Sequence, residues 1–143
     1  MSKAECDNCS LDKIAGELKS HSALPKGMAG RVVKFKGERE RLNEIVMKYA
    51  GRNIKRFYSI DAGVYEAGAL PKKHKELMGL VGSLVLRCDD CITYHVIRSH
   101  EEGASGKEIE EALAIGLVIG VSITIPHMRR AMEVLDELKS KKV

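Results

Sequence analysis

Apolar residues recur at intervals of three and four along most of the chain, the spacing that gathers them on one face of an α-helix. Leu42, Ile45 and Tyr49 show this pattern, and Gly51 then ends the helix. No segment alternates apolar and polar residues with the period of two typical of a β-strand. The pattern predicts an all-α fold of six or seven helices: a short first helix over about 10–18, then 38–50, 53–66, 71–86, 89–102 and 106–124, and a last amphipathic helix over about 128–138.

Particular residues indicate where several helices begin or end. Pro71 is expected in the first turn of the fourth helix, where its missing N–H costs no hydrogen bond. Ser105 and Glu108 have the spacing of a capping box at the start of the sixth helix, and Pro126 ends or kinks that helix. Residues 77–86 contain no charged side chain. The fourth helix is therefore predicted to be buried on nearly every side.

The length of 143 residues suits one compact domain, and 44% apolar residues are enough for a hydrophobic core. Aromatic residues make up only 4% of the chain, so aliphatic side chains and Met must build that core. Pro25 and Gly30 interrupt residues 20–36, which are predicted to be irregular. We therefore expect an N-terminal arm with a short helix over residues 1–36 and a single helical domain over residues 37–143.

Charge and hydropathy argue against nucleic acid and membranes as partners. Lys and Arg number 24 against 20 Asp and Glu, but the positive charges are interspersed and stacking aromatic residues are scarce. The first 25 residues contain no apolar signal segment. The longest uncharged apolar stretch, 112–125, is shorter than the roughly 20 residues of a membrane span. We therefore expect a cytoplasmic protein.

The four cysteines form two Cys-x-x-Cys pairs, Cys6 with Cys9 and Cys88 with Cys91. In a cytoplasmic chain this spacing indicates redox chemistry or metal binding more often than structural disulfides. Three interpretations of Cys6 and Cys9 stay open at this stage: a second redox pair, a metal site, or unreactive thiols. The second pair, Cys88 and Cys91, is followed at helical spacing by His95, which indicates its chemistry.

Cys88, Cys91 and His95 project from one face of the predicted fifth helix, because they are spaced three, four and seven residues apart. The pair also lies at the helix start, where unpaired backbone amides favour a thiolate, and a His one turn along can accept the thiol proton. Asp89 and Asp90 act in the opposite sense, since negative charge between the thiols opposes thiolate formation. The arrangement is that of a redox dithiol with its own base.

A carboxylate partner for His95 follows from helix geometry. If the chain turns back near Arg87, Glu76 lies about 16 Å before the turn and His95 about 12 Å after it, at about 1.5 Å per residue. The two side chains can therefore reach the same level of two antiparallel helices. Gly79 and Ser83 leave a slim face against which the neighbouring helix can lie. A half-buried Glu76 would orient the imidazole and hold or relay its proton.

Other interpretations of these residues are a pair of ordinary buried thiols, a hydrogen-bonded core histidine and a solvated glutamate. Zinc is a further alternative, because two Cys and one His need only a fourth ligand to complete a tetrahedral site. Glu76 or a thiolate of Cys6 or Cys9 could supply that ligand. In that case the protein would be a zinc-binding helical assembly module.

Three segments carry a resemblance to a known family: residues 70–77 (LPKKHKEL), residues 88–95 (CDDCITYH), and residues 103–113, with GAS at the start and EIEEAL from position 108. A Glu separated by eleven residues from a C-x-x-C-x-x-x-H motif is the specific feature, and the similarity covers about residues 57–125. The chain resembles the carboxymuconolactone decarboxylase family, and more narrowly its AhpD-like, alkylhydroperoxidase branch. The resemblance implies an AhpD-like helical fold assembled as a homo-oligomer, a trimer or a hexamer.

The resemblance further implies a peroxidase or disulfide oxidoreductase, and we expect no cofactor. Glu76 and His95 would form the proton relay, with Cys91 as the attacking thiolate and Cys88 as the resolving thiol. The substrate would be a peroxide or a disulfide, and an external thioredoxin-like or lipoyl dithiol would reduce the resulting disulfide. The branch that names the family acts on a lactone acid without needing the cysteine pair. Lactone decarboxylation is therefore an alternative, against which the presence of all four motif residues argues.

Assembly is also expected from the residues themselves. The fourth and sixth helices are apolar nearly all round, and one short chain has too few other helices to cover both. Gly116 and Gly120 form a small-xxx-small pair, which favours close helix packing, either within the chain or across a subunit interface. We therefore expect neighbouring chains to complete the cover and to shield the site from water.

Overall fold

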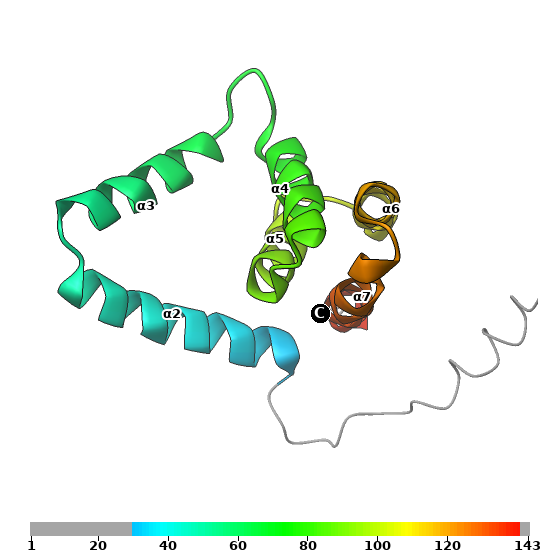
Figure 1. The fold of residues 1–143 in the computed structure, drawn as a ribbon, viewed down its shortest axis with the longest axis horizontal. Coiled ribbons are helices and arrows are strands. Elements are labelled where there is room, and N and C mark those ends of the chain that lie inside the picture. The colour runs from blue at the N-terminus through cyan, green and yellow to red at the C-terminus, as the bar shows by residue number, and fades with distance from the viewer. Residues whose placement is uncertain (1–29, 141–143) are drawn as a thin grey trace, which may run out of the picture.

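The computed structural model describes residues 30–140, and every regular element in this range is helical (Figure 1). The all-α prediction is thereby confirmed. Cys6, Cys9 and the predicted first helix lie outside the described residues. In chain order the elements are α2 (Arg31–Tyr49), α3 (Arg52–Val64), α4 (Lys72–Leu86), α5 (Asp89–Glu101), α6 (Gly106–Gly120), the 3₁₀ turn η2 (Ser122–Thr124) and α7 (Ile125–Ser140).

The first described helix begins earlier than its apolar spacing predicted. α2 starts at Arg31, whereas the sequence predicted an irregular chain through residue 36. That expectation was wrong because Pro25 and Gly30, on which it rested, precede the helix, and its first turns are stabilised by burying Val32 and packing Phe35 against the core. Residues 31–36 are therefore helical, and the division of the chain into an arm and a domain otherwise stays a prediction.

The predicted helix over 106–124 is broken near its end. Val121 has a φ of 51°, a left-handed conformation that ends α6 at Gly120. A 3₁₀ turn follows, in which the Thr124 hydroxyl donates to the Val121 carbonyl at 2.8 Å. Pro126 was expected to end or kink α6, but it lies in the first turn of α7, where a proline fits without loss of a hydrogen bond. The break is therefore at Val121.

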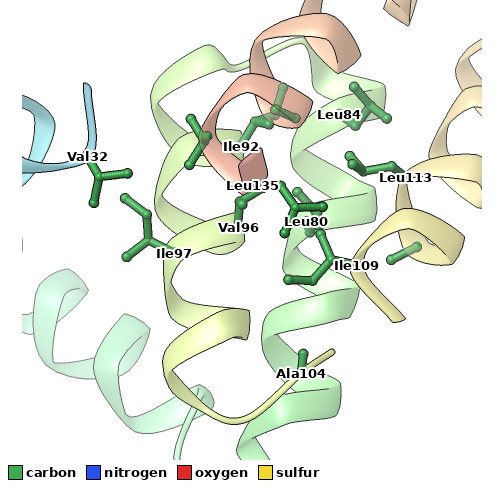
Figure 2. Close-up of a cluster of buried hydrophobic side chains, with 13 residues drawn as sticks. Val32, Leu80, Leu84, Ile92, Val96, Ile97, Ala104, Ile109, Leu113 and Leu135 are labelled. Atoms are coloured by element: carbon green, nitrogen blue, oxygen red, sulfur yellow. The ribbon is translucent and has the colours of Figure 1, made fainter. Parts of the chain in front are cut away.

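The hydrophobic core lies where four helices meet. α4 packs against α5 and α6, and α5 packs in turn against α7. At Gly116 an added Cβ would lie 2.8 Å from Leu84 Cδ2, so this glycine lets α6 approach α4 closely within one chain. Figure 2 shows the side chains that fill the centre, which are buried almost completely: Leu80 and Leu84 from α4, Ile92 and Val96 from α5, Ile109 and Leu113 from α6, and Leu135 from α7.

One face of α4 stays exposed in the single chain. Leu80 and Leu84 are buried against α5 and α6, whereas Met78 is 54% and Leu86 is 78% exposed. The prediction that α4 is buried on nearly every side is therefore wrong for one chain. The reason is geometric, because two neighbouring helices cover only part of a helix's circumference.

α2 and α3 stand beside the four-helix core. Figure 1 shows α2 running away from the core to a bend, from which α3 returns toward the loop that leads into α4. The first turn of α2 is tied to α7, where Arg31 Nη1 lies 2.6 Å from Glu133 Oε2. α3 buries none of its residues, although it carries large apolar side chains such as Phe57 and Ile60. None of the helices described is both long and apolar enough to cross a membrane.

Candidate active site

The Cys-x-x-Cys pair lies at the turn between α4 and α5. Arg87 ends α4 in a left-handed conformation, with φ at 59°, and the chain reverses into α5. Cys88 is the residue before α5, and its Sγ accepts a hydrogen bond from the Cys91 backbone N–H at 3.4 Å. A disulfide joins Cys88 and Cys91. The predicted position of both sulfurs at a helix N-terminus is confirmed.

The two cysteines differ in their exposure. Cys88 is half-buried behind the turn, whereas Cys91 is exposed. Cys91 and His95 line one cavity of about 870 Å³. Its walls come from α2, α3, α5 and α7, and its apolar lining includes Phe35, Leu42, Tyr65 and Tyr94. The second sulfur of the motif is therefore the one that an incoming molecule meets first.

Glu76 and His95 meet as the helix geometry predicted. His95 Nδ1 lies 2.8 Å from Glu76 Oε2, and the two residues are only 7% and 2% exposed. Arg98 Nε lies 3.7 Å from the other Glu76 oxygen. A buried carboxylate needs partners of this kind, because an unpaired charge in the interior is costly. With Nδ1 hydrogen-bonded to the carboxylate, the imidazole orientation is fixed and Nε2 is the nitrogen left for other partners.

Tyr65 is that other partner. Its hydroxyl lies 3.4 Å from His95 Nε2, and the two ring centroids are 5.3 Å apart. Burial, helped by the nearby Glu76 and Asp61 carboxylates, raises the pKa of Tyr65 above its ordinary value. The hydroxyl therefore keeps its proton at neutral pH. Tyr65 was not among the site residues predicted from the sequence, because it follows α3 and shares no helical spacing with the motif.

Gly79 makes the room in which these side chains meet. A Cβ at this position would lie 2.6 Å from His95 Cε1 and 2.7 Å from the Tyr65 hydroxyl oxygen. Both distances are shorter than any normal contact, so a larger residue would displace one ring or the other. The slim face predicted for α4 is confirmed at Gly79.

A second polar cluster contacts Asp89, the first of the two residues between the cysteines. Asp89 Oδ1 lies 2.8 Å from His127 Nδ1 and 3.0 Å from Arg130 Nε, and Arg130 Nη2 lies 2.8 Å from Asp89 Oδ2. Burial acts to raise the pKa of Asp89, but hydrogen bonds and charge from Arg130 and His127 outweigh it and lower that pKa. This cluster was not predicted from the sequence, because His127 and Arg130 are about forty residues away from Asp89 along the chain.

The zinc alternative requires several ligand side chains close together. Within residues 30–140 no group of three or more His, Cys, Asp or Glu side chains is arranged to hold a metal ion. Two of the candidate fourth ligands, Cys6 and Cys9, lie outside the described residues.

Comparison with known proteins defines the family. Residues 54–137 match the carboxymuconolactone decarboxylase family, and the chain belongs to that family. The resemblance noted in the sequence is therefore confirmed at the family level. A curated relative from Paracoccus denitrificans, the uncharacterized protein 4 in cox locus, is 32% identical over 82 residues, which are 57% of this chain and 74% of the relative.

Solved structures share the fold. A crystal structure from Thermotoga maritima has 56% sequence identity and a TM-score of 0.73, covering 75% of this chain and 94% of that one. A second crystal structure from that organism, with 56% identity and a TM-score of 0.72, covers 75% of this chain and 91% of its own; it is described as a carboxymuconolactone decarboxylase family protein with a suggested part in the antioxidative response. A family member from Legionella pneumophila, with 21% identity and a TM-score of 0.66, covers 78% of this chain and 97% of its own and shows the fold alone.

Proposed function

We propose that the protein is a thiol-dependent oxidoreductase of the AhpD-like branch, which reduces peroxides or exchanges disulfides through Cys88 and Cys91. The observation that carries this proposal is the buried hydrogen bond of 2.8 Å between His95 and Glu76 beside an exposed Cys91. A base held by a carboxylate within one helical turn of a dithiol is the arrangement that activates a thiol nucleophile. The suggested antioxidative part of the Thermotoga maritima relative agrees with it.

The proton relay begins in the reduced enzyme. Glu76 accepts the His95 Nδ1 hydrogen, so Nε2 carries no proton and can take up the Cys91 thiol proton, either directly or through the Tyr65 hydroxyl that lies 3.4 Å from it. The buried Glu76 then stabilises the imidazolium that results. Unpaired backbone amides at the start of α5 favour the thiolate at the same time.

The redox step converts two thiols into one disulfide. The Cys91 thiolate attacks a peroxide oxygen, the O–O bond breaks, and the leaving alkoxide takes up the proton from the relay as an alcohol. Cys91 is then a sulfenic acid, which the Cys88 thiol attacks to form the disulfide and release water. One peroxide is reduced by two electrons, and one dithiol is oxidised. An external thioredoxin-like or lipoyl dithiol then reduces the disulfide by thiol exchange, so no bound cofactor is needed.

The choice of Cys91 as the attacking thiol rests on exposure. Cys91 lines the 870 Å³ cavity together with His95, whereas Cys88 is half-buried. Cys88 lies within bonding distance once Cys91 is oxidised, since a disulfide joins them in the structure. Cys88 is therefore the resolving thiol. A dithiol of this kind works where thiols are kept reduced, and we place the protein in the cytoplasm.

We also propose that the working form is a trimer or a hexamer, with no nucleic acid or membrane partner. α3 carries exposed Phe57, Ile60 and Val64 on a helix that buries none of its residues. On α6, Val118 is 80% exposed. Exposed apolar surface of this extent is typical of an interface, and a symmetric assembly of identical chains would bury it.

Mass mapping after oxidation tests the function. Reduced protein treated with one equivalent of hydrogen peroxide or an organic hydroperoxide should form the Cys88–Cys91 disulfide. His95→Gln and Glu76→Gln should slow this at least tenfold, whereas His100→Gln, an exposed histidine on the same helix, should not. If neither the disulfide nor a sulfenic acid forms in the wild type, the proposal fails.

A further inference from the structure

Asp89 is the first residue of α5 and follows Cys88 directly. Asp90 comes next, so two carboxylates separate the sulfurs. Both are placed to oppose a thiolate, because like charges raise each other's energy. The two carboxylates nevertheless have different surroundings. Asp90 is exposed and lines the cavity with Cys91, whereas Asp89 is turned toward α7.

Arg130 and His127 of α7 hold the Asp89 carboxylate on both oxygens. Arg130 approaches Oδ1 through Nε at 3.0 Å and Oδ2 through Nη2 at 2.8 Å, a paired geometry that guanidinium and carboxylate groups favour. His127 Nδ1 lies 2.8 Å from Oδ1. Contacts of this kind fix the start of α5 against α7 and place a positive charge next to the carboxylate of Asp89, the residue that follows Cys88.

We propose that Arg130 is a positioning residue that keeps the cysteine pair reactive by neutralising Asp89. This inference rests on the proposed function, since it concerns the reactivity of the same two thiols. With Arg130 in place, the pair has one unneutralised carboxylate beside it, Asp90, and the amides at the start of α5 act on the sulfurs without opposition from Asp89. Without Arg130, two carboxylates oppose the thiolate. His127 orients Asp89 from the same helix.

Five variants separate this electrostatic role from a structural one. Arg130→Lys keeps the positive charge opposite Asp89. Arg130→Gln removes the neutralising charge, and Asp89→Asn removes the charge that it neutralises. The double variant removes both. Arg129→Gln is the matched control, because Arg129 is the exposed neighbour in α7 and carries the same charge. The charged side chains that line the cavity are the same in every variant: Arg31, Lys34, Glu38, Arg39, Asp61, Asp90 and Glu133.

The readout is the rate at which iodoacetamide alkylates the reduced protein between pH 5 and 9, with the modified cysteine identified by mass mapping. Arg130→Gln should slow alkylation at pH 7 about two- to fivefold and move the profile to higher pH, the size expected of one charge in a partly solvated site. Asp89→Asn should move the profile to lower pH. The double variant should lie within about twofold of wild type, as should Arg129→Gln and Arg130→Lys.

Two results would overturn the inference. One is an Arg129→Gln profile that matches Arg130→Gln, because the effect would then be one of net charge. The other is a double variant as slow as Arg130→Gln, because the contact would then act through structure alone. Failure of the proposed function gives a different pattern: peroxide would leave the cysteines unoxidised while this cycle of variants still shifted alkylation as described.

Discussion

At the scale of single residues, the site depends on buried polar side chains that hydrogen-bond to one another. Glu76 and His95 are almost fully buried and hydrogen-bond to each other, with Arg98 close to the second carboxylate oxygen. Each group would be costly in the interior without its partner. The hydrogen bond that offsets the cost of burying the two groups also determines that Nε2, and not Nδ1, is the basic imidazole nitrogen. Stability and chemistry therefore depend on the same hydrogen bond.

Gly79 provides a test of this packing. Gly79→Ala places a methyl group within 2.6 Å of His95 Cε1 and displaces the imidazole or the Tyr65 hydroxyl. We expect the rate of peroxide-driven disulfide formation to fall about ten- to hundredfold, since small misplacements of catalytic groups have large effects. Gly82→Ala is the control on the same helix, because a Cβ there meets nothing within 4 Å. It should leave the rate unchanged and stabilise α4 by up to about 1 kcal/mol. Equal rates for the two variants would contradict the account.

Tyr65 has a predicted pH signature. Tyr65→Phe removes the hydroxyl that lies 3.4 Å from His95 Nε2, and the oxidation rate should fall about two- to tenfold. Because the pKa of Tyr65 is raised by burial and by the nearby carboxylates, the hydroxyl stays protonated up to pH 9. The wild-type to variant ratio should therefore be constant from pH 6 to 9 in stopped-flow measurements. A ratio that collapses within this range would show that Tyr65 titrates there and is not held as described.

At the scale of helices, the sequence predicted those features that are determined by residues close together in the chain. The capping box of Ser105 and Glu108 is present as expected. The meeting of Glu76 with His95 could also be predicted, because it needs only the rise of a helix and one reversal of the chain. The site residues as a catalytic set stay a proposal.

The rest depends on contacts between distant segments. The start of α2 is determined by how Val32 and Phe35 pack on helices that come later in the chain. Tyr65 reaches the site from the end of α3 and Arg130 from α7, and no spacing along the sequence relates them to Cys88 or Cys91. Such residues can be found only once the tertiary structure is known.

The start of α6 gives a prediction about stability and pH. Hydrogen bonds from Lys73 and from Ser105 lower the pKa of Glu108 to about 2. A carboxyl whose pKa is lowered on folding stabilises the protein above its unfolded pKa, near 4.5, and loses this contribution as the pH falls toward 2. Glu108→Gln should therefore lower the thermal midpoint at pH 6, and the difference from wild type should shrink between pH 5 and 2.5. A difference that grows on acidification would contradict the capping assignment.

Ser105→Ala removes the hydroxyl that caps α6 and should lower the free energy of unfolding by about 1 kcal/mol at neutral pH.

At the scale of the whole molecule, exposed apolar helix faces predict an assembly. Light scattering at micromolar concentration should give a trimer or a hexamer for the wild type. Ile60→Glu, on the apolar face of α3, should shift the population to smaller species, because it puts a charge into the predicted interface. Ser59→Glu adds the same charge at the neighbouring exposed position and should leave the assembly intact. A stable wild-type monomer of about 16 kDa would remove this prediction.

The central claim is that Glu76 and His95 activate the cysteine pair, and thiol alkylation as a function of pH tests it most directly. Reduced wild-type protein should be alkylated at Cys91 well below the pH at which an ordinary thiol reacts, near 8.5. His95→Ala should move that profile toward the ordinary value, and Glu76→Gln should move it part of the way. If the wild-type, His95→Ala and Glu76→Gln profiles coincide between pH 5 and 9, the relay does not act on the thiols and the account is wrong.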